Sequence, residues 1–176
     1  GPKWLTTPVI TKGKRAQLIS DAQIDYSGKF PTSHINMIEQ NYKQSPFFSN
    51  YSEDFFNVLR KENAHLSNLS IDLILLTRKL LDIKTTIKYS SDFFTKGSQA
   101  ELLAELCIHV GASEYLSPPG SKVYLDDSNS FNRRNIPIKY FDYKHPNYPQ
   151  AYGDFIEYMS VIDLLFNCGP ESKFLL

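Results

Sequence analysis

Residues 98–122 read SQAELLAELCIHVGASEYLSPPGSK, and this stretch decides the class of fold. It opens with SQAE, a capping box in which the Ser98 and Glu101 side chains are expected to bind free amides of a first helical turn. The apolar residues that follow predict a helix to about residue 110, where Gly111 supplies a left-handed C-cap. The dipeptide YL is then predicted as a short strand, and the loop SPPGSK follows it.

Helices and strands alternate on both sides of this stretch. We predict a helix over residues 68–81, strands over 85–89 and 136–140, and a last helix that opens at a second capping box over 160–163. The first of these helices is apolar on more than one face, which predicts deep burial. Strands that alternate with helices are typical of a mostly parallel sheet. We therefore predict the α/β class, as a three-layer Rossmann-like domain with helices on both faces.

The N-terminal part adds edge strands and two further helices. Residues 3–10 alternate and are β-branched, which predicts a strand, and residues 16–24 could pair with them as antiparallel edge strands. A basic turn over residues 12–15 would connect the two. Ser33 and Ser52 are each expected to cap a helix.

The composition bounds the class of protein. At 176 residues with 41% apolar residues, the chain is expected to form a single domain over residues 1–176. Its 19 basic and 19 acidic residues balance, which argues against a nucleic-acid partner. We find no apolar run that could span a bilayer and no signal peptide, so we expect a cytoplasmic protein. Cys107 and Cys168 fit no disulfide or zinc pattern and are predicted to be buried thiols.

Two polar loops are expected to follow strands of the predicted sheet. Ser90 and Ser91 come after the strand over 85–89, and Ser117 begins the loop that leads to Lys122. Ligands bind beyond the carboxyl ends of parallel strands, so these loops form the predicted site. The Lys122 ammonium could bind a phosphate or a carboxylate there, and the alternative is a solvated surface lysine.

Histidine supplies one candidate for proton transfer. His34 lies in the first turn of its predicted helix and could act as a general acid or base, since histidine titrates near neutral pH. It could instead cap the helix or pack on Tyr42. His65 and His109 are interpreted as surface or satisfied histidines, and His145 lies in an aromatic loop. No pair of histidines has a metal-ligand spacing, so we predict no metal site.

Polar side chains near the C-terminus complete the candidates. Gln150 lies among aromatic residues, where core packing does not account for it, and it is predicted to contact a substrate. Asn167 could close the last helix or reach a ligand, and Asp163 is interpreted as a capping residue. The aromatic residues nearby could form a wall on which a sugar or base stacks, but a core under a long loop is commoner. They are Tyr140, Phe141, Tyr143, Tyr148 and Tyr152.

Several blocks of the sequence occur in an order that resembles one family. They are KWLTTPV, HINMIEQNY, VGASEYLS, KVYLDD, HPNYPQAYGDF and SVIDLLFNCGP. Over nearly its whole length the chain resembles the WbqC-like family, bacterial proteins associated with gene clusters for O-antigen and other surface polysaccharides. It departs from the family pattern in two places. The first strand-turn-strand segment is expected to be absent, and Pro118 replaces a glycine, which excludes a left-handed backbone angle there.

The resemblance implies a transferase of surface-polysaccharide or related biosynthesis that acts on a nucleotide-linked sugar or an activated acyl or aminoacyl group. The catalytic residues of the implied site are His34 and Lys122. The residues that would bind this small-molecule substrate are Ser90, Ser91, Ser117, Gln150 and Asn167. The histidine would be the acid or base, and the lysine and serines would hold an anionic group. The alternative is a non-catalytic binding or scaffold subunit of a biosynthetic complex. No cofactor is evident, and the oligomeric state stays open.

Overall fold

The structure is a computed structural model that describes residues 2–14 and 16–176. Two compact units divide the chain. Unit 1 combines the residues up to Lys84 with His145–Leu176, and unit 2 consists of Thr85–Lys144. Each unit has its own buried core, so each is described by itself.

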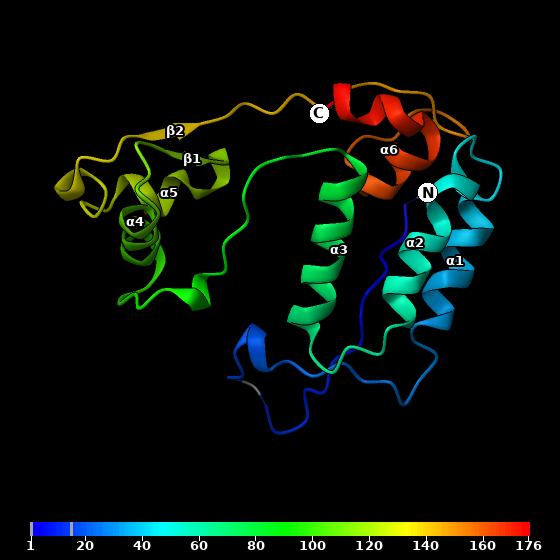
Figure 1. Cartoon of the computed structure of the whole chain (residues 1–176), viewed down its shortest axis with the longest axis horizontal. Coiled ribbons are helices and arrows are strands. Elements are labelled where there is room, and N and C mark those ends of the chain that lie inside the picture. Colours follow the sequence, from blue (N-terminus) through cyan, green and yellow to red (C-terminus); the bar gives the residue numbers. More distant parts are fainter. Residues whose placement is uncertain (1, 15) are drawn as a thin grey trace. The chain divides into compact units, whose positions relative to one another are not determined.

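Unit 1 is built from helices that surround a buried phenylalanine. These helices are α1 (Thr32–Tyr42), α2 (Phe48–Arg60), α3 (Leu66–Leu80) and α6 (Val161–Cys168) (Figure 1). Their apolar faces meet in one core, and Phe166 of α6 is fully buried in it. The rings of Tyr42, Phe48 and Phe55 pack edge-to-face on Phe166, with centroid distances of 5.4, 5.2 and 6.1 Å. Residues distant in the sequence therefore share one aromatic core.

The predicted N-caps of α1 and α2 are wrong. Pro31 precedes the first helical residue of α1, and no side chain caps that helix, so Ser33 is not its cap. Ser52 lies inside α2 and is buried. Helix α2 begins about one turn earlier, at Phe48, because the Phe48 ring packs on Phe166 and fixes the first turn.

The predicted deep burial of α3 is also wrong. Among the residues of α3, Leu69 is the buried one, whereas Ile74 is 54% exposed and Leu75 is 37% exposed. Helix α3 contacts α2 along one face, so apolar residues outside that stripe reach the surface. Apolar residues on several faces therefore did not imply burial on all of them.

The predicted N-terminal hairpin is reduced to isolated bridges. Val9 pairs with Ile24 in an antiparallel bridge, as the prediction implied, but neither predicted segment forms a strand in the part of the chain that the structure describes. Pro8 has no amide hydrogen, so it cannot donate to the ladder that would extend this bridge. Arg15 of the predicted basic turn lies outside the described residues.

Unit 2 contains helices and a small parallel sheet. Its elements are α4 (Gln99–Val110), β1 (Tyr115–Ser117), α5 (Lys122–Asp126) and β2 (Ile138–Tyr140). Strands β1 and β2 pair in parallel, with Tyr115 opposite Ile138 and Ser117 opposite Tyr140. The mixture of helices and strands and the parallel pairing are thus confirmed, and they are consistent with the α/β class. The described sheet has two strands, and a three-layer Rossmann-like arrangement stays a prediction.

Helix α4 has the predicted boundaries but not the predicted cap. It begins after Ser98 and ends at Gly111, whose φ of 68° is left-handed as expected. No side chain of the SQAE box binds a first-turn amide. The Glu101 carboxylate instead accepts a hydrogen bond of 2.5 Å from Arg134, which also pairs with Glu105. An ion-pair network therefore replaces the capping box.

The predicted strand over residues 85–89 is wrong. These residues form no regular element, and Ser90–Asp92 forms a 3₁₀ turn after them. β-branched residues favour an extended chain, but a strand also needs a neighbour to pair with, and no described segment pairs with this one. Ser90 and Ser91 consequently do not follow a strand of the sheet.

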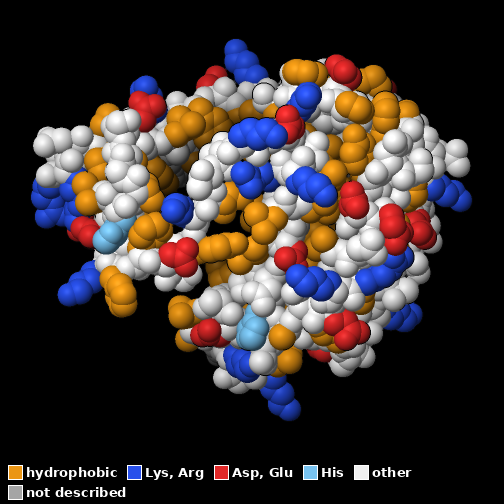
Figure 2. Space-filling model, in the orientation of Figure 1, with side chains coloured by type: hydrophobic (Ala, Val, Ile, Leu, Met, Phe, Trp, Pro, Cys, Tyr) orange, Lys and Arg blue, Asp and Glu red, His pale blue; other side chains and the backbone are white. Residues whose placement is uncertain are grey.

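The surface reflects the balance of charges. Figure 2 shows Lys and Arg side chains interspersed with Asp and Glu on the visible face. None of the helices formed by residues 2–14 and 16–176 has the length and apolar character that crossing a bilayer requires.

Candidate functional site

Two serines form the hydrogen bonds that stabilise the loop between β1 and α5. Ser117 is fully buried, and its Oγ forms a hydrogen bond with Oγ of Ser121. The Ser121 hydroxyl also lies 2.7 Å from the Pro118 carbonyl oxygen, to which it donates. The loop therefore closes on itself before α5 begins. A contact between Ser117 and a substrate stays a prediction.

This loop brings Lys122 to the carboxyl edge of the strand pair. Lys122 is exposed, and its Nζ lies 5.6 Å from the centroid of the Tyr140 ring, at the end of β2. The Tyr140 hydroxyl donates to Oδ1 of Asp126 at 2.6 Å, which raises the pKa of Tyr140 to about 12. The tyrosine therefore stays neutral at physiological pH and supports the ammonium with its ring face. An exposed cation on an ordered support suits the binding of an anion.

A buried carboxylate organises a second region, which lies in unit 1. Asp163 of α6 is 4% exposed. Its Oδ2 accepts hydrogen bonds from the Tyr148 hydroxyl and from Nε2 of Gln150, each at 2.8 Å. Its Oδ1 accepts a bond of 3.3 Å from Nδ2 of Asn167. We call these residues, together with Tyr42, the Asp163 cluster; it brings together two of the predicted site residues, Gln150 and Asn167.

The two tyrosines of the Asp163 cluster are donors, not bases. Burial raises the pKa of Tyr42, and the charge of Asp163 and a hydrogen bond to it raise this pKa further. Burial and the hydrogen bond to Asp163 likewise raise the pKa of Tyr148. A phenol whose pKa is raised keeps its proton at neutral pH. Both hydroxyls therefore stabilise the buried carboxylate.

Gln150 connects this carboxylate to the loop that precedes α6. Its Nε2 donates to the Ile156 carbonyl oxygen at 3.0 Å, and its Oε1 accepts from the Ile156 amide at 2.8 Å. With the bond to Asp163, both hydrogens of the Gln150 amide are in use. Asn167 is similarly engaged, since its Nδ2 also donates to the Asp163 carbonyl oxygen at 2.8 Å. Contacts of Gln150 and Asn167 with a substrate stay predictions.

The predicted second capping box places α6 correctly but misassigns Asp163. Helix α6 begins after Ser160, as expected, yet no side chain caps it. The Asp163 carboxylate instead accepts hydrogen bonds from Tyr148 and Gln150. These two side chains take the place of the free first-turn amides that a capping carboxylate would bind. The interpretation of Asp163 as a capping residue is therefore wrong.

His34 occupies the first turn of α1, as predicted. Its ring packs edge-to-face on Phe30, with 5.0 Å between centroids, and it is hydrogen-bonded to the backbone of Thr6. Burial lowers the pKa of His34 from its ordinary value of 6.5, and the bond to Thr6 opposes this shift. A lowered pKa keeps the imidazole neutral at pH 7, which is the state that can accept a proton.

The predicted site residues are divided between the two units. His34, Gln150 and Asn167 belong to unit 1, whereas Lys122 and the predicted serines belong to unit 2. Ser90 and Ser91 are exposed in their 3₁₀ turn. Cys107 and Cys168 are free and buried, as predicted. No cluster of His, Cys, Asp and Glu that could hold a metal ion occurs among residues 2–14 and 16–176.

Sequence reasoning missed a pocket of about 600 Å³ in unit 1. Its walls include Trp4, Tyr42 and Tyr158, none of which was a candidate. Trp4 carried one usable signal, because it is the one tryptophan of the chain. No spacing in the sequence relates Tyr42 to Asp163 or Trp4 to Tyr158.

Comparison with known proteins identifies the family. Residues 1–174 match the family model described as the WbqC-like protein family. The chain belongs to this family. The WbqC-like chain is similar to "Uncharacterized protein Rv1507c" of Mycobacterium tuberculosis, with 32% identity over 174 residues, 98% of this chain and 74% of the relative. No solved structure matches it. The resemblance noted in the sequence is thus confirmed.

Proposed function

We propose that this WbqC-like protein is a transferase of bacterial surface-polysaccharide or related biosynthesis, acting on a nucleotide-linked sugar or an activated acyl or aminoacyl group. One observation carries the proposal: the exposed Lys122 ammonium lies at the carboxyl edge of a parallel strand pair. This edge is where α/β proteins tend to bind ligands. Nucleotide-linked donors carry phosphates beside the group that is transferred, so a cation at this edge suits them.

In the proposed reaction Lys122 neutralises the donor phosphates. The ring of Tyr140, which Asp126 holds by its hydroxyl, limits the positions that the ammonium can take. The exposed hydroxyls of Ser90 and Ser91 would contribute hydrogen bonds to the same anionic group, whereas the buried Ser117 hydroxyl would act by holding the loop that carries Lys122. A role of His34 of unit 1 as the acid or base stays a prediction, and its lowered pKa favours the neutral imidazole that such a role needs.

A thermal-shift screen tests this proposal on the whole chain. Nucleotides, nucleotide-sugars and acyl donors are added to wild type, to Lys122→Ala and to Lys96→Ala, a control that removes another exposed lysine of unit 2. A ligand at about 100 times its dissociation constant adds roughly 2.7 kcal/mol to the free energy of unfolding. We expect one class to stabilise the wild type and Lys96→Ala but not Lys122→Ala.

Turnover then separates the transferase from the binding subunit. A transferase is expected to release the free nucleotide or carrier slowly from its donor when water replaces the acceptor. Stabilisation by a donor without such release would favour the non-catalytic binding subunit. Absence of stabilisation by every nucleotide and acyl donor would contradict the proposal.

A further inference from the structure

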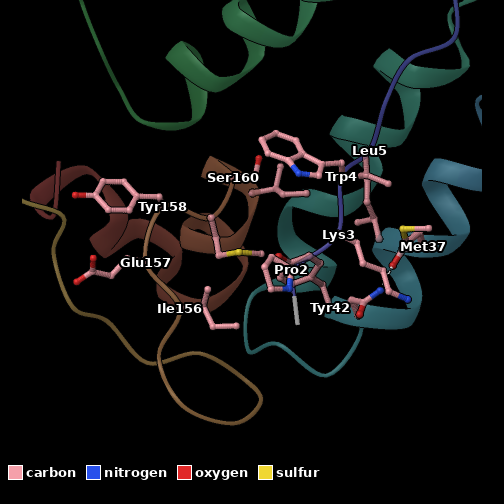
Figure 3. A pocket seen from close by; sticks show the side chains of 14 residues that line it. Pro2, Lys3, Trp4, Leu5, Met37, Tyr42, Ile156, Glu157, Tyr158 and Ser160 are labelled. Carbon is pink, nitrogen blue, oxygen red and sulfur yellow. Dashed lines mark hydrogen bonds between the residues drawn. The ribbon is translucent and has the colours of Figure 1, made fainter. Parts of the chain in front are cut away.

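The pocket in unit 1 lies at the edge of the aromatic core. Its volume is about 600 Å³, within the range of roughly 300–1,000 Å³ typical of small-molecule sites. Its lining residues come from residues 2–5, from helix α1 and from residues 156–162 (Figure 3). Among them Ile38 is 6% exposed, and Tyr42 and Ile162 pack against the core. The core of unit 1 therefore gives this pocket an apolar and firmly packed floor.

Polar groups that line the unit 1 pocket are directed or bonded elsewhere. The Glu157 carboxylate and the Tyr158 ring point away from the other labelled side chains (Figure 3). The Tyr158 ring packs on His145 instead, with 5.0 Å between ring centroids. Nδ2 of Asn41 donates to the Met37 carbonyl oxygen at 2.7 Å. These groups therefore do not select a ligand that is rich in hydroxyls.

Apolar side chains dominate what remains around the unit 1 pocket. Trp4 is 94% exposed, and Leu5 and Ile156 are 37% and 38% exposed. Tyr42 offers its ring alone, because its hydroxyl is hydrogen-bonded to Asp163. Single exposed apolar residues are ordinary, but several around one pocket indicate a binding surface. A hydrocarbon ligand would remove this apolar area from water, which is favourable.

One cation belongs to the same lining. Lys3 is exposed, and the one acidic residue of the lining, Glu157, points its carboxylate away. A ligand with a hydrocarbon chain and an anionic head matches an ammonium beside an apolar pocket. We propose that the unit 1 pocket binds a single acyl chain with an anionic head group, whose charge lies beside Lys3. This inference goes beyond the proposed function, because it involves neither Lys122 nor the donor.

The single tryptophan reports whether this pocket is occupied. Trp4 is the one tryptophan among the 176 residues, so its emission can be excited apart from that of tyrosine. The full chain is titrated with hexanoate, octanoate, decanoate and dodecanoate, each below the concentration at which it forms micelles. We expect a saturable blue shift, because the chain covers an indole that water now surrounds. We also expect the affinity to rise about fourfold with each added methylene, until the pocket is full.

A second series identifies the head group. Decanol, decanoate and decyl phosphate have the same chain with no charge, a carboxylate or a phosphate. We expect wild type to bind decanoate about two- to fivefold more tightly than decanol, and Lys3→Gln to lose this preference. Tighter binding of decyl phosphate than of decanoate would identify the phosphate head of a lipid, and the reverse order a fatty acid. Both orders support the inference, whereas equal affinity for decanol and decanoate in wild type contradicts the role of Lys3.

Variants tie the emission change to the pocket. Met159→Gln places an amide in the lining at nearly constant shape, and we expect it to weaken decanoate binding about tenfold. Leu5→Gln should act in the same direction, and its partly exposed position makes loss of the fold unexpected. Leu18→Gln is the matched control, because Leu18 is an exposed leucine of the same unit outside the pocket. Its titration should equal that of wild type.

Three results would overturn the inference: unchanged Trp4 emission with every acyl compound, an affinity that does not depend on chain length, or wild-type affinity in both Leu5→Gln and Met159→Gln. A shift of Trp4 emission with protein concentration alone, accompanied by dimers in sedimentation, would place a second copy in the pocket and would also overturn it. The inference and the proposed function can fail separately. An acyl donor that acts through the pocket loses its stabilising effect in Leu5→Gln, and one that acts through Lys122 loses it in Lys122→Ala.

Discussion

The Asp163 cluster and the Lys122 loop contain similar chemistry in opposite environments. Both set a charged group beside tyrosine hydroxyls or rings, yet Asp163 is 4% exposed and Lys122 is open to solvent. The Asp163 carboxylate accepts hydrogen bonds from the side chains of the Asp163 cluster, Tyr42, Tyr148, Gln150 and Asn167. The Lys122 ammonium rests on a ring face, an interaction that leaves its N–H donors available.

The difference separates a structural charge from one that can bind a ligand. A buried carboxylate is costly unless its oxygens are paired, so its partners are committed to it. An exposed ammonium gains little from its neighbours and can exchange water for a phosphate at small cost. We therefore expect changes at Asp163 to reduce stability and changes at Lys122 to reduce binding.

The largest expected effect is on the stability of the Asp163 cluster. Asp163→Ala would remove the acceptor of the Tyr148 hydroxyl and one of the two acceptors of each amide group of Gln150 and Asn167. Each buried donor without a partner costs about 1–3 kcal/mol, so we expect the free energy of unfolding to fall by about 3 kcal/mol or more. Urea denaturation measures this loss. Asp163→Asn keeps an acceptor of the same shape and should lose less; an alanine variant as stable as wild type would refute the structural role.

A smaller effect is expected in the loop that carries Lys122. Ser121→Ala removes the hydroxyl that bonds to Ser117 and to the Pro118 carbonyl. We expect a loss of about 1–3 kcal/mol in the free energy of unfolding, because two hydrogen bonds worth about 0.5–1.5 kcal/mol each are removed. Ser117→Ala combined with Ser121→Ala should cost less than the sum of the single changes, because the two share one bond. Strict additivity in urea denaturation would show that the serines do not interact.

The smallest stability effect depends on pH. Because burial lowers the pKa of His34 in the folded state, the unfolded chain binds a proton there at a pH where the folded chain does not. The stability that the neutral His34 contributes is therefore fully present above the ordinary pKa of about 6.5. It is lost as the pH falls below this value. Urea midpoints near pH 7 and near pH 5 should differ more in wild type than in His34→Gln. Equal differences in the two proteins would exclude His34 as the cause.

Local sequence signals predicted helix positions and the parallel pair but not tertiary partners. Helices α4 and α6 begin where their boxes begin, and Gly111 ends α4 as its backbone freedom requires. The side chains of those boxes, Glu101 and Asp163, instead bind Arg134, Tyr148 and Gln150. A capping signal states which residues could cap a helix, whereas distant donors decide whether they do.

Extended segments and the site were harder to predict for the same reason. Residues 85–89 have strand propensity, but propensity cannot supply a neighbouring strand. Gln150 was recognised as a polar residue that core packing does not explain, and Asn167 as one that could close the last helix or reach a ligand. Their meeting at Asp163 depends on a loop that folds back on α6. The residues that line the unit 1 pocket include Trp4 and Tyr158, which lie far apart in the sequence. No local sequence pattern could therefore predict this pocket.

One pair of measurements on one variant tests the central claim that Lys122 binds the donor. Lys122→Ala is unfolded in urea, and the donor that stabilises the wild type is titrated into it. The account predicts a free energy of unfolding within about 0.5 kcal/mol of wild type, as for an exposed side chain. It also predicts at least a tenfold loss of affinity, which corresponds to about 1.4 kcal/mol. A variant that loses stability while binding the donor as tightly as wild type would contradict the account.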